Sequence, residues 1–158
     1  SSSPVEVLAF WLIQGASGNV EAASSVVAAD VAWVGFGASP DVFVEGSEPY
    51  GVSDVEMACS SDDTLAVCEM TFSDLWIAAI PELERGGFNV QAEVVAGMIV
   101  AFQTLSLHGD TAAAFFSHTA WLEAEQPEQL EQACASDPAA KACSELYVNT
   151  VEDWVASR

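Results

Sequence analysis

The sequence is poor in basic residues. Its 158 residues include 24 acidic side chains and only three basic ones, Arg85, Lys141 and Arg158, so the formal net charge is −21. A surface of this charge repels phosphate backbones, and the composition therefore excludes binding to nucleic acid. We interpret the acidity as that of a protein surface suited to a saline habitat, with docking of a basic partner as the alternative.

This acidity predicts a stability that depends on salt. Self-repulsion destabilises the compact state at low salt, and at about 1 M salt the screening length falls to about 3 Å. We therefore expect the melting temperature to rise substantially between low and roughly molar salt. Thermal denaturation followed by circular dichroism measures the effect, and a flat response would contradict the saline-habitat interpretation.

Long apolar runs and several motifs are also missing. No run approaches the roughly 18 to 20 apolar residues that a membrane-spanning helix requires, although 51% of the residues are hydrophobic. The patterns GxSxG, HExxH, HxxxH and CxxC and a glycine-rich phosphate loop do not occur. The two histidines, His108 and His118, do not share a helix face. We therefore expect no metal site and no cofactor.

The four cysteines predict two local disulfides. Cys59 and Cys68 flank SSDDTLAV, and Cys134 and Cys143 flank ASDPAAKA. A hairpin that turns near Asp63-Thr64 places the first two directly opposite each other, and the second two join the end of one helix to the start of the next.

Two disulfides indicate an oxidising, extracytoplasmic compartment. The start SSSPVEVLAFW lacks the features of a signal peptide. We therefore expect a mature bacterial chain, either secreted or held by a lipid anchor on a removed N-terminal segment.

Hydrophobic periodicity and capping signals predict helices at both ends of the chain and a sheet between them. This order is typical of an α+β fold with a largely antiparallel sheet. In chain order we expect helices at 4–14 and 19–30, a strand at 31–37, a loop at 41–51, a hairpin at 52–73, a short helix capped by Ser73, a second hairpin at 88–107, a helix capped by Asp110, and a last helix from Asp137.

Three stretches resemble the nuclear transport factor 2-like superfamily, which includes SnoaL-like and ketosteroid-isomerase-like proteins. They are GNVEAASSVVAADVAWVGFG, FSDLWIAAIPELERGGFNVQAEV and VVAGMIVAFQTL. The resemblance implies a strongly bent antiparallel sheet wrapped around the N-terminal helices as a cone. It makes residues 1–158 a single SnoaL-like domain, with a core cone at 1–107 and a helical extension at 108–158.

The resemblance also implies a pocket at the open end of the cone, but not the usual chemistry. The base position of the isomerases falls at Phe36 or a neighbouring glycine. Helix 4–14 offers Phe10 and Trp11 where a tyrosine is expected, and the opposing acid corresponds only to a residue near Glu93. We therefore transfer no catalytic residue from the family.

The candidate ligand-binding residues are mainly aromatic, and the catalytic candidates are weak. Asp30 is interpreted as an acid at a helix end, and His108 as a surface or capping residue. The expected pocket residues are Trp11, Trp33, Phe36, Tyr50 and Trp76, and the weak catalytic candidates are Asp30, Tyr50 and His108.

Three hypotheses of function remain open at this point. The first is an extracytoplasmic domain that binds a small apolar molecule in an aromatic pocket. The second is a SnoaL-like isomerase, cyclase or hydrolase with a non-standard acid and base. The third is a structural or dimerising interaction module, so the chain is expected to be a monomer or a homodimer.

Overall fold

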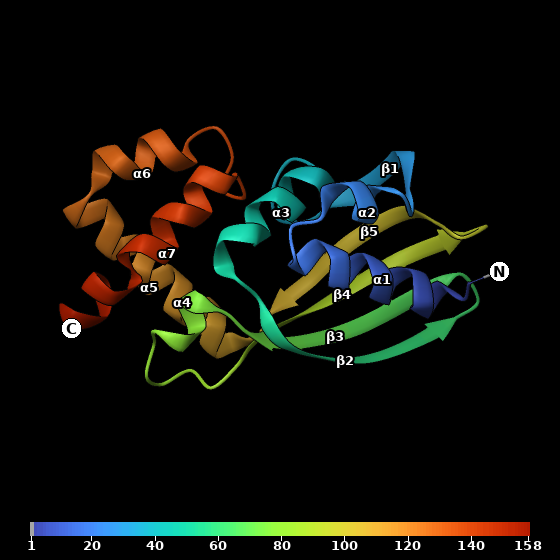
Figure 1. Cartoon of the computed structure of the whole chain (residues 1–158), viewed down its shortest axis with the longest axis horizontal. Helices are drawn as coiled ribbons and strands as arrows, with labels where there is room; N and C mark the ends of the chain where they lie inside the picture. The colour runs from blue at the N-terminus through green and yellow to red at the C-terminus, as the bar shows by residue number, and fades with distance from the viewer. Residues whose placement is uncertain (1) are drawn as a thin grey trace.

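The computed structural model describes residues 2–158, except for the side chain of Leu105. Helices precede and follow a bent sheet, and the last three helices lie beside one end of it (Figure 1). The elements are α1 Pro4–Ala16, α2 Val20–Ser24, β1 Val27–Val34, α3 Pro40–Ser47, the 3₁₀ turn η1 Glu48–Tyr50, β2 Ser53–Asp62, β3 Leu65–Ser73, α4 Leu75–Ala78, β4 Gly86–Val95, β5 Met98–Leu107, α5 Gly109–Glu125, α6 Pro127–Cys134 and α7 Lys141–Ala156.

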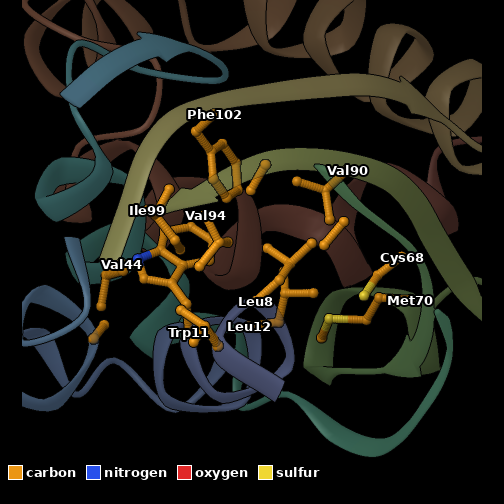
Figure 2. Close-up of a cluster of buried hydrophobic side chains, with 14 residues drawn as sticks. Leu8, Trp11, Leu12, Val44, Cys68, Met70, Val90, Val94, Ile99 and Phe102 are labelled. Atoms are coloured by element: carbon orange, nitrogen blue, oxygen red, sulfur yellow. The ribbon is translucent and has the colours of Figure 1, made fainter. Parts of the chain in front are cut away.

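The sheet has five strands in the order β1-β5-β4-β3-β2. The hairpins β2–β3 and β4–β5 and the β3–β4 pair are antiparallel, as the sequence predicts, whereas β1 runs parallel to β5 and makes the sheet mixed. Register shifts interrupt the β4–β5 pairing after Asn89 and Glu93. Such irregularities bend a sheet, and the strands curve around α1 (Figure 2).

Helix α1 fills the concave side of the sheet. Ser3 caps it by accepting a hydrogen bond from the Glu6 N–H, and Pro4 occupies its first turn, as the sequence predicts. Leu8, Trp11 and Leu12 are fully buried against side chains of β3, β4 and β5 (Figure 2). The predicted cone-shaped α+β fold is therefore confirmed.

The expected loop at 41–51 is wrong, because this segment forms α3 and η1. Ser39 caps α3 by accepting from the Val42 N–H, and Pro40 follows it, so the start signal is the same as that of α1. Val44 is completely buried. A Cβ on Gly46 would lie 1.8 Å from the Ala139 carbonyl oxygen, so this glycine lets α3 pack against the segment before α7.

The expected second helix is too long. It ends at Ser24, and the chain is already in β1 from Val27. The run SVVAADVAWV is rich in β-branched residues, and pairing of β1 with β5 decides the conformation. Asp30 therefore lies within a strand, and its interpretation as an acid at a helix end is wrong.

Three expected helix starts also differ. Asp74, not Ser73, caps α4, and α5 begins after His108 without a side-chain cap. Asp137 does not start α7, because its carboxylate accepts hydrogen bonds from the N–H groups of Ala38 and Ala139 at 2.9 Å each. That contact joins the segment before α7 to the segment before α3.

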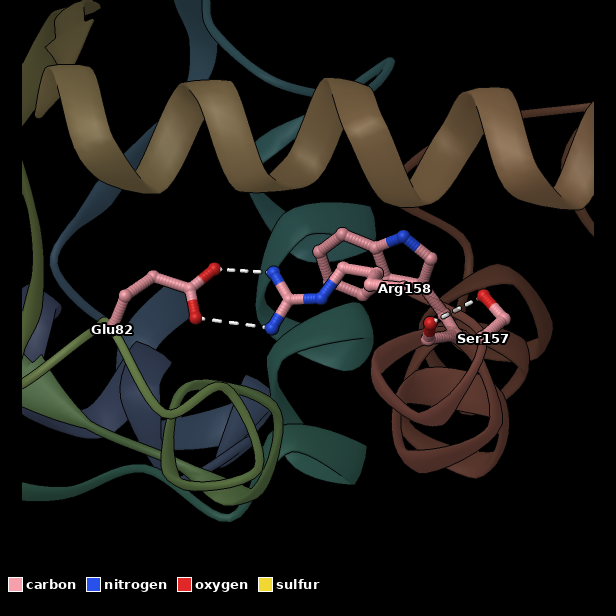
Figure 3. A network of polar contacts seen from close by, with 4 residues as sticks. Glu82, Ser157 and Arg158 are labelled. Atoms are coloured by element: carbon pink, nitrogen blue, oxygen red, sulfur yellow. Dashed lines mark hydrogen bonds and ion pairs between the residues drawn. The ribbon is translucent and has the colours of Figure 1, made fainter.

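The C-terminal helices pack around a second apolar cluster. Trp76 and Ile77 from α4 join Leu122 of α5 and Trp154 of α7 in this cluster. Arg158 lies over the Trp154 ring at 5.1 Å and forms a two-pronged ion pair with Glu82 (Figure 3). The chain end is thus fixed to the α4–β4 connection by an exposed contact.

Both predicted disulfides are confirmed, as Cys59–Cys68 across the first hairpin and Cys134–Cys143 between α6 and α7. Within residues 2–158, no helix is long and apolar enough to cross a membrane.

Removal of the Cys134–Cys143 disulfide is expected to destabilise the protein. In the chain-entropy model, a loop of this length contributes about 2 to 3 kcal/mol to the free energy of unfolding. We expect the double variant Cys134→Ala, Cys143→Ala to lose this amount in urea denaturation. The matched pair Cys59→Ala, Cys68→Ala has the same separation and is expected to lose a similar amount. Unchanged stability in both double variants would contradict a stabilising role of the disulfides.

Candidate functional site

A cavity of about 490 Å³ lies between the cone and the C-terminal helices. This volume is within the range of small-molecule sites. Its walls come from helices, strands and the turns between them. They are Trp11, Leu12 and Ala16 of α1; Val34, Gly35 and Phe36 at the end of β1; Phe43 and Ser47 of α3; Tyr50 of η1; Val52 before β2; Met70 and Phe72 of β3; Asp74, Trp76 and Ile77 at α4; Phe88 of β4; Thr104 and Leu107 of β5; and Thr111 and Phe115 of α5.

Four of the five expected pocket residues border this cavity, namely Trp11, Phe36, Tyr50 and Trp76. Trp33 does not. Its indole N–H donates to the Gly37 carbonyl at 2.9 Å, and its ring stacks on Phe102 at 4.8 Å. Trp33 therefore stabilises the turn after β1, behind the cavity wall.

Part of the cavity lining is both apolar and exposed. Val34, Phe36 and Leu107 line the cavity and are 64%, 42% and 47% exposed. Phe36 meets Phe115 edge to face at 6.4 Å, so the segment after β1 contacts α5 here. Exposed apolar side chains around a cavity are typical of an entrance for a ligand or of a contact surface.

Asp74 is the acidic group of the cavity. Its side chain caps α4 by accepting from the Ile77 N–H at 2.6 Å, and the residue is 7% exposed. Burial raises the pKa of this carboxyl from 3.8 to about 6, although hydrogen bonds from the Ile77 and Trp76 backbone act in the opposite direction. At neutral pH the cavity therefore holds a buried carboxylate.

Tyr50 faces the same end of the cavity. Burial raises the pKa of its hydroxyl far above the ordinary value, and the Asp74 charge raises it further. A hydrogen bond with Ser144 acts in the opposite direction. Tyr50 therefore stays protonated and can donate a hydrogen bond.

Thr111 adds an unpartnered hydroxyl. The residue lines the cavity and is 8% exposed, and its Oγ1 has no hydrogen-bond partner among the residues that the structure describes. An unpaired buried hydroxyl costs free energy. The buried Thr111 hydroxyl is therefore a destabilising polar group in the wall of the cavity.

The other weak catalytic candidates lie elsewhere. Asp30 is exposed on β1, and neither it nor His108 borders the cavity. His108 Nε2 lies 3.4 Å from a Glu69 oxygen near the outer surface. Glu93, the position nearest the family's opposing acid, is also exposed. Of the three catalytic candidates, only Tyr50 lies at the cavity.

His118 belongs to a buried polar chain behind the cavity wall. The Trp76 indole N–H donates to His118 Nδ1 at 2.9 Å, so Nε2 carries the proton and donates to Thr150 Oγ1 at 2.9 Å. Thr150 in turn donates to the Leu146 carbonyl at 2.7 Å. Burial lowers the pKa of His118 to about 4. This neutral histidine joins α4, α5 and α7.

The sequence does not single out Asp74, Thr111 or Phe115. Asp74 follows Ser73 directly, and either residue is a good cap, so a cap and a buried acid give the same pattern. Thr111 and Phe115 lie on α5, outside the expected core cone. The only signal for them is their position at the start of the helix that follows β5.

No protein-family model matches the sequence, and no curated protein matches it. The similar solved structures include a cystatin-fold protein from Novosphingobium aromaticivorans, with TM-score 0.51, 8% identity, and coverage of 67% of this chain and 100% of that one. A de novo designed protein with a curved β-sheet has TM-score 0.52 and 17% identity, and covers 73% of this chain and 92% of its own. An NTF2-like protein from Burkholderia thailandensis E264 has TM-score 0.45 and 15% identity, and covers 72% and 96%.

At these identities the likeness concerns the fold alone. The two structures above with a TM-score over 0.5 are the cystatin-fold protein and the designed protein with a curved β-sheet. The likeness to them agrees with the curved-sheet α+β fold that the sequence resemblance implies.

Proposed function

We propose that the protein is an extracytoplasmic domain that binds a small, largely apolar molecule in the cavity. The observation that carries this proposal is a cavity of about 490 Å³ with mostly apolar walls and a few polar residues: Ser47, Tyr50, Asp74, Thr104 and Thr111. Burial of apolar ligand surface supplies affinity in such a site, and the polar groups fix the orientation. The two disulfides support the extracytoplasmic location.

We also propose that residues 1–158 act as one functional unit. The helical extension at 108–158 supplies Thr111 and Phe115 to the cavity, and the cone at 1–107 supplies the remaining walls. Both parts therefore contribute walls to the proposed binding site.

Filling the cavity with a large side chain is expected to weaken binding. Thr104 lines the cavity from β5, and Gln103 precedes it on the exposed face of the same strand. The variant Thr104→Trp is expected to weaken binding of an apolar probe such as 4-phenylbutan-1-ol at least about tenfold, because a large ring displaces the ligand. Isothermal titration calorimetry measures the loss.

The matched variant Gln103→Trp adds the same ring outside the cavity and is expected to bind as the unmodified protein does. Equal binding by both variants would show that the probe binds elsewhere and would contradict the proposal.

A second candidate function is proton transfer at Asp74. A carboxylate with a pKa of about 6 is basic enough to accept a proton from an activated carbon, and the Tyr50 hydroxyl can donate to the oxygen that becomes negative. Asp74→Asn separates the candidates, because it removes the base and keeps the cap. Loss of turnover with retained binding of neutral ligands favours the enzyme, whereas a substrate screen without turnover in either protein favours the binding protein.

A further inference from the structure

The cavity contains an uncompensated negative charge. Asp74 is the only carboxyl group among its described lining residues, and none of these residues is Lys, Arg or His. The three basic side chains are engaged elsewhere: Arg85 with Glu56 at 3.7 Å, Lys141 with Glu48 at 3.4 Å, and Arg158 with Glu82. A buried charge without a counter-ion is unusual in a folded protein.

The groups around Asp74 donate hydrogen bonds but carry no positive charge. The donors are the α4 backbone N–H groups of Trp76 and Ile77. The uncharged hydroxyl of Tyr50 is also near, and its own neighbours on α7 are Ser144 and Tyr147. His118 of α5 accepts the Trp76 indole N–H, and burial keeps this histidine neutral by lowering its pKa to about 4. A cation is therefore the component that this end of the cavity lacks.

We propose that the cavity binds the protonated amine of an otherwise apolar molecule, with the Asp74 carboxylate as its counter-ion and the aromatic walls around its hydrocarbon part. This inference rests on the proposed function and names the class of ligand. The desolvation of Asp74 is incurred on folding, so an entering ammonium group loses only its own hydration and gains the full attraction of the carboxylate.

Two further features favour a cation. The Tyr50, Trp76 and Phe115 rings border the cavity, and aromatic faces attract organic cations. The net charge of −21 also raises the concentration of cations at the protein surface. A bare metal ion fits less well, because no group of three His, Cys, Asp or Glu side chains that could hold a metal ion occurs in the part of the chain that the structure describes.

Three probes of one shape test the inference: 4-phenylbutylamine, 4-phenylbutan-1-ol and 4-phenylbutanoate, titrated by calorimetry in about 1 M salt to screen the surface charge. We expect the amine to bind at least about tenfold more tightly than the alcohol near pH 8, and the carboxylate most weakly. In Asp74→Asn we expect the amine and the alcohol to bind within about threefold of each other. The matched variant Glu125→Gln removes an exposed acid of α5, and the amine preference is expected to remain.

The pH dependence supplies a second readout. The amine stays protonated below about pH 10, whereas Asp74, with its pKa of about 6, gains a proton as the pH falls. Amine binding is therefore expected to weaken between pH 8 and 5, and alcohol binding is expected to stay constant.

The outcomes separate the inference from the proposed function. Equal affinity for the amine and the alcohol in the unmodified protein, or an amine preference that survives Asp74→Asn, would overturn the inference and leave the binding function standing. Absence of binding by all three probes would overturn both.

Discussion

Replacement of Asp74 by Asn is expected to stabilise the protein at neutral and alkaline pH. Asparagine caps a helix as well as aspartate does, and its amide oxygen can accept the hydrogen bond from the Ile77 N–H. What disappears is the cost of a buried carboxylate. The pKa of Asp74 rises from 3.8 to about 6 on folding, and a shift of about 2 units corresponds to about 3 kcal/mol. We expect Asp74→Asn to raise the free energy of unfolding by about 2 to 3 kcal/mol near pH 8.

The sign of the pH dependence follows from the same shift. The folded state holds the Asp74 proton more tightly than the unfolded state, so the cost is fully present above about pH 6 and is relieved as the pH falls toward 3.8. The two proteins are therefore expected to converge near pH 4.

Urea denaturation across this pH range measures the difference. The matched variant Asp41→Asn changes an exposed acid of α3 and is expected to alter stability by no more than about 0.5 kcal/mol. An Asp74→Asn variant less stable than the unmodified protein near pH 8 would show that the carboxylate stabilises the fold. The expected gain instead marks Asp74 as a residue that opposes stability at a cavity, as functional groups often do.

Replacement of His118 by Leu is expected to destabilise the protein by about 1 to 3 kcal/mol. The substitution nearly conserves volume but leaves the buried Trp76 indole N–H without its acceptor. Thr150 keeps its bond to the Leu146 carbonyl, so the loss reports mainly on the indole. The His118 ring also lies parallel to Trp154 at 4.8 Å, and this contact is lost as well.

A double-mutant cycle with Trp76→Phe checks the assignment. Phenylalanine has no N–H group that could lose its acceptor. His118→Leu is therefore expected to destabilise the Trp76→Phe background less than the unmodified protein, with a coupling free energy of at least about 0.5 kcal/mol. Additive losses would mean that the Trp76–His118 bond contributes nothing to stability.

His118 and Asp74 are expected to affect the acid side of the stability profile in opposite directions. Folding lowers the pKa of His118 from 6.5 to about 4, so its contribution is complete above pH 6.5 and is lost as the pH falls toward 4. Protonation of Asp74 removes the destabilisation caused by its buried carboxylate over nearly the same pH range. The unmodified protein should therefore show a flatter profile than either Asp74→Asn, which keeps only the histidine loss, or His118→Leu, which keeps only the aspartate gain.

The sequence predicts the sheet and its two disulfides because those features depend on local sequence patterns. Cys59 and Cys68 face each other once the turn at Asp63 is placed, and the period of two then assigns Met70 to the core face. The sequence does not predict helix α3, although Ser39 and Pro40 form the same helix-start signal as Ser3 and Pro4 of α1. The glycine, proline and acidic residues of EGSEPYG suggest a loop, and the burial of Val44 that stabilises the helix comes from α1 and the sheet.

The aromatic wall of the site could be predicted and its polar end could not. The family resemblance and the aromatic content predict Trp11, Tyr50 and Trp76 as pocket residues, and all three line the cavity. Trp33 does not line it, and its indole N–H donates to the Gly37 carbonyl. Asp74 and Thr111 are far apart in sequence, both are buried at the cavity, and the Thr111 hydroxyl has no partner among the described residues. Burial and missing partners are tertiary facts, so no local pattern contains them.

The central claim is that the cavity between the cone and the C-terminal helices binds a small molecule. The most direct test is an isotope-filtered NOE spectrum of methyl-labelled protein with bound 4-phenylbutan-1-ol. Binding in the cavity predicts NOEs from the phenyl ring to the methyl groups of Leu12, Met70 and Ile77, which line the cavity, and none to Ile13 or Val95, which are exposed outside it. NOEs confined to the exposed methyl groups would contradict it.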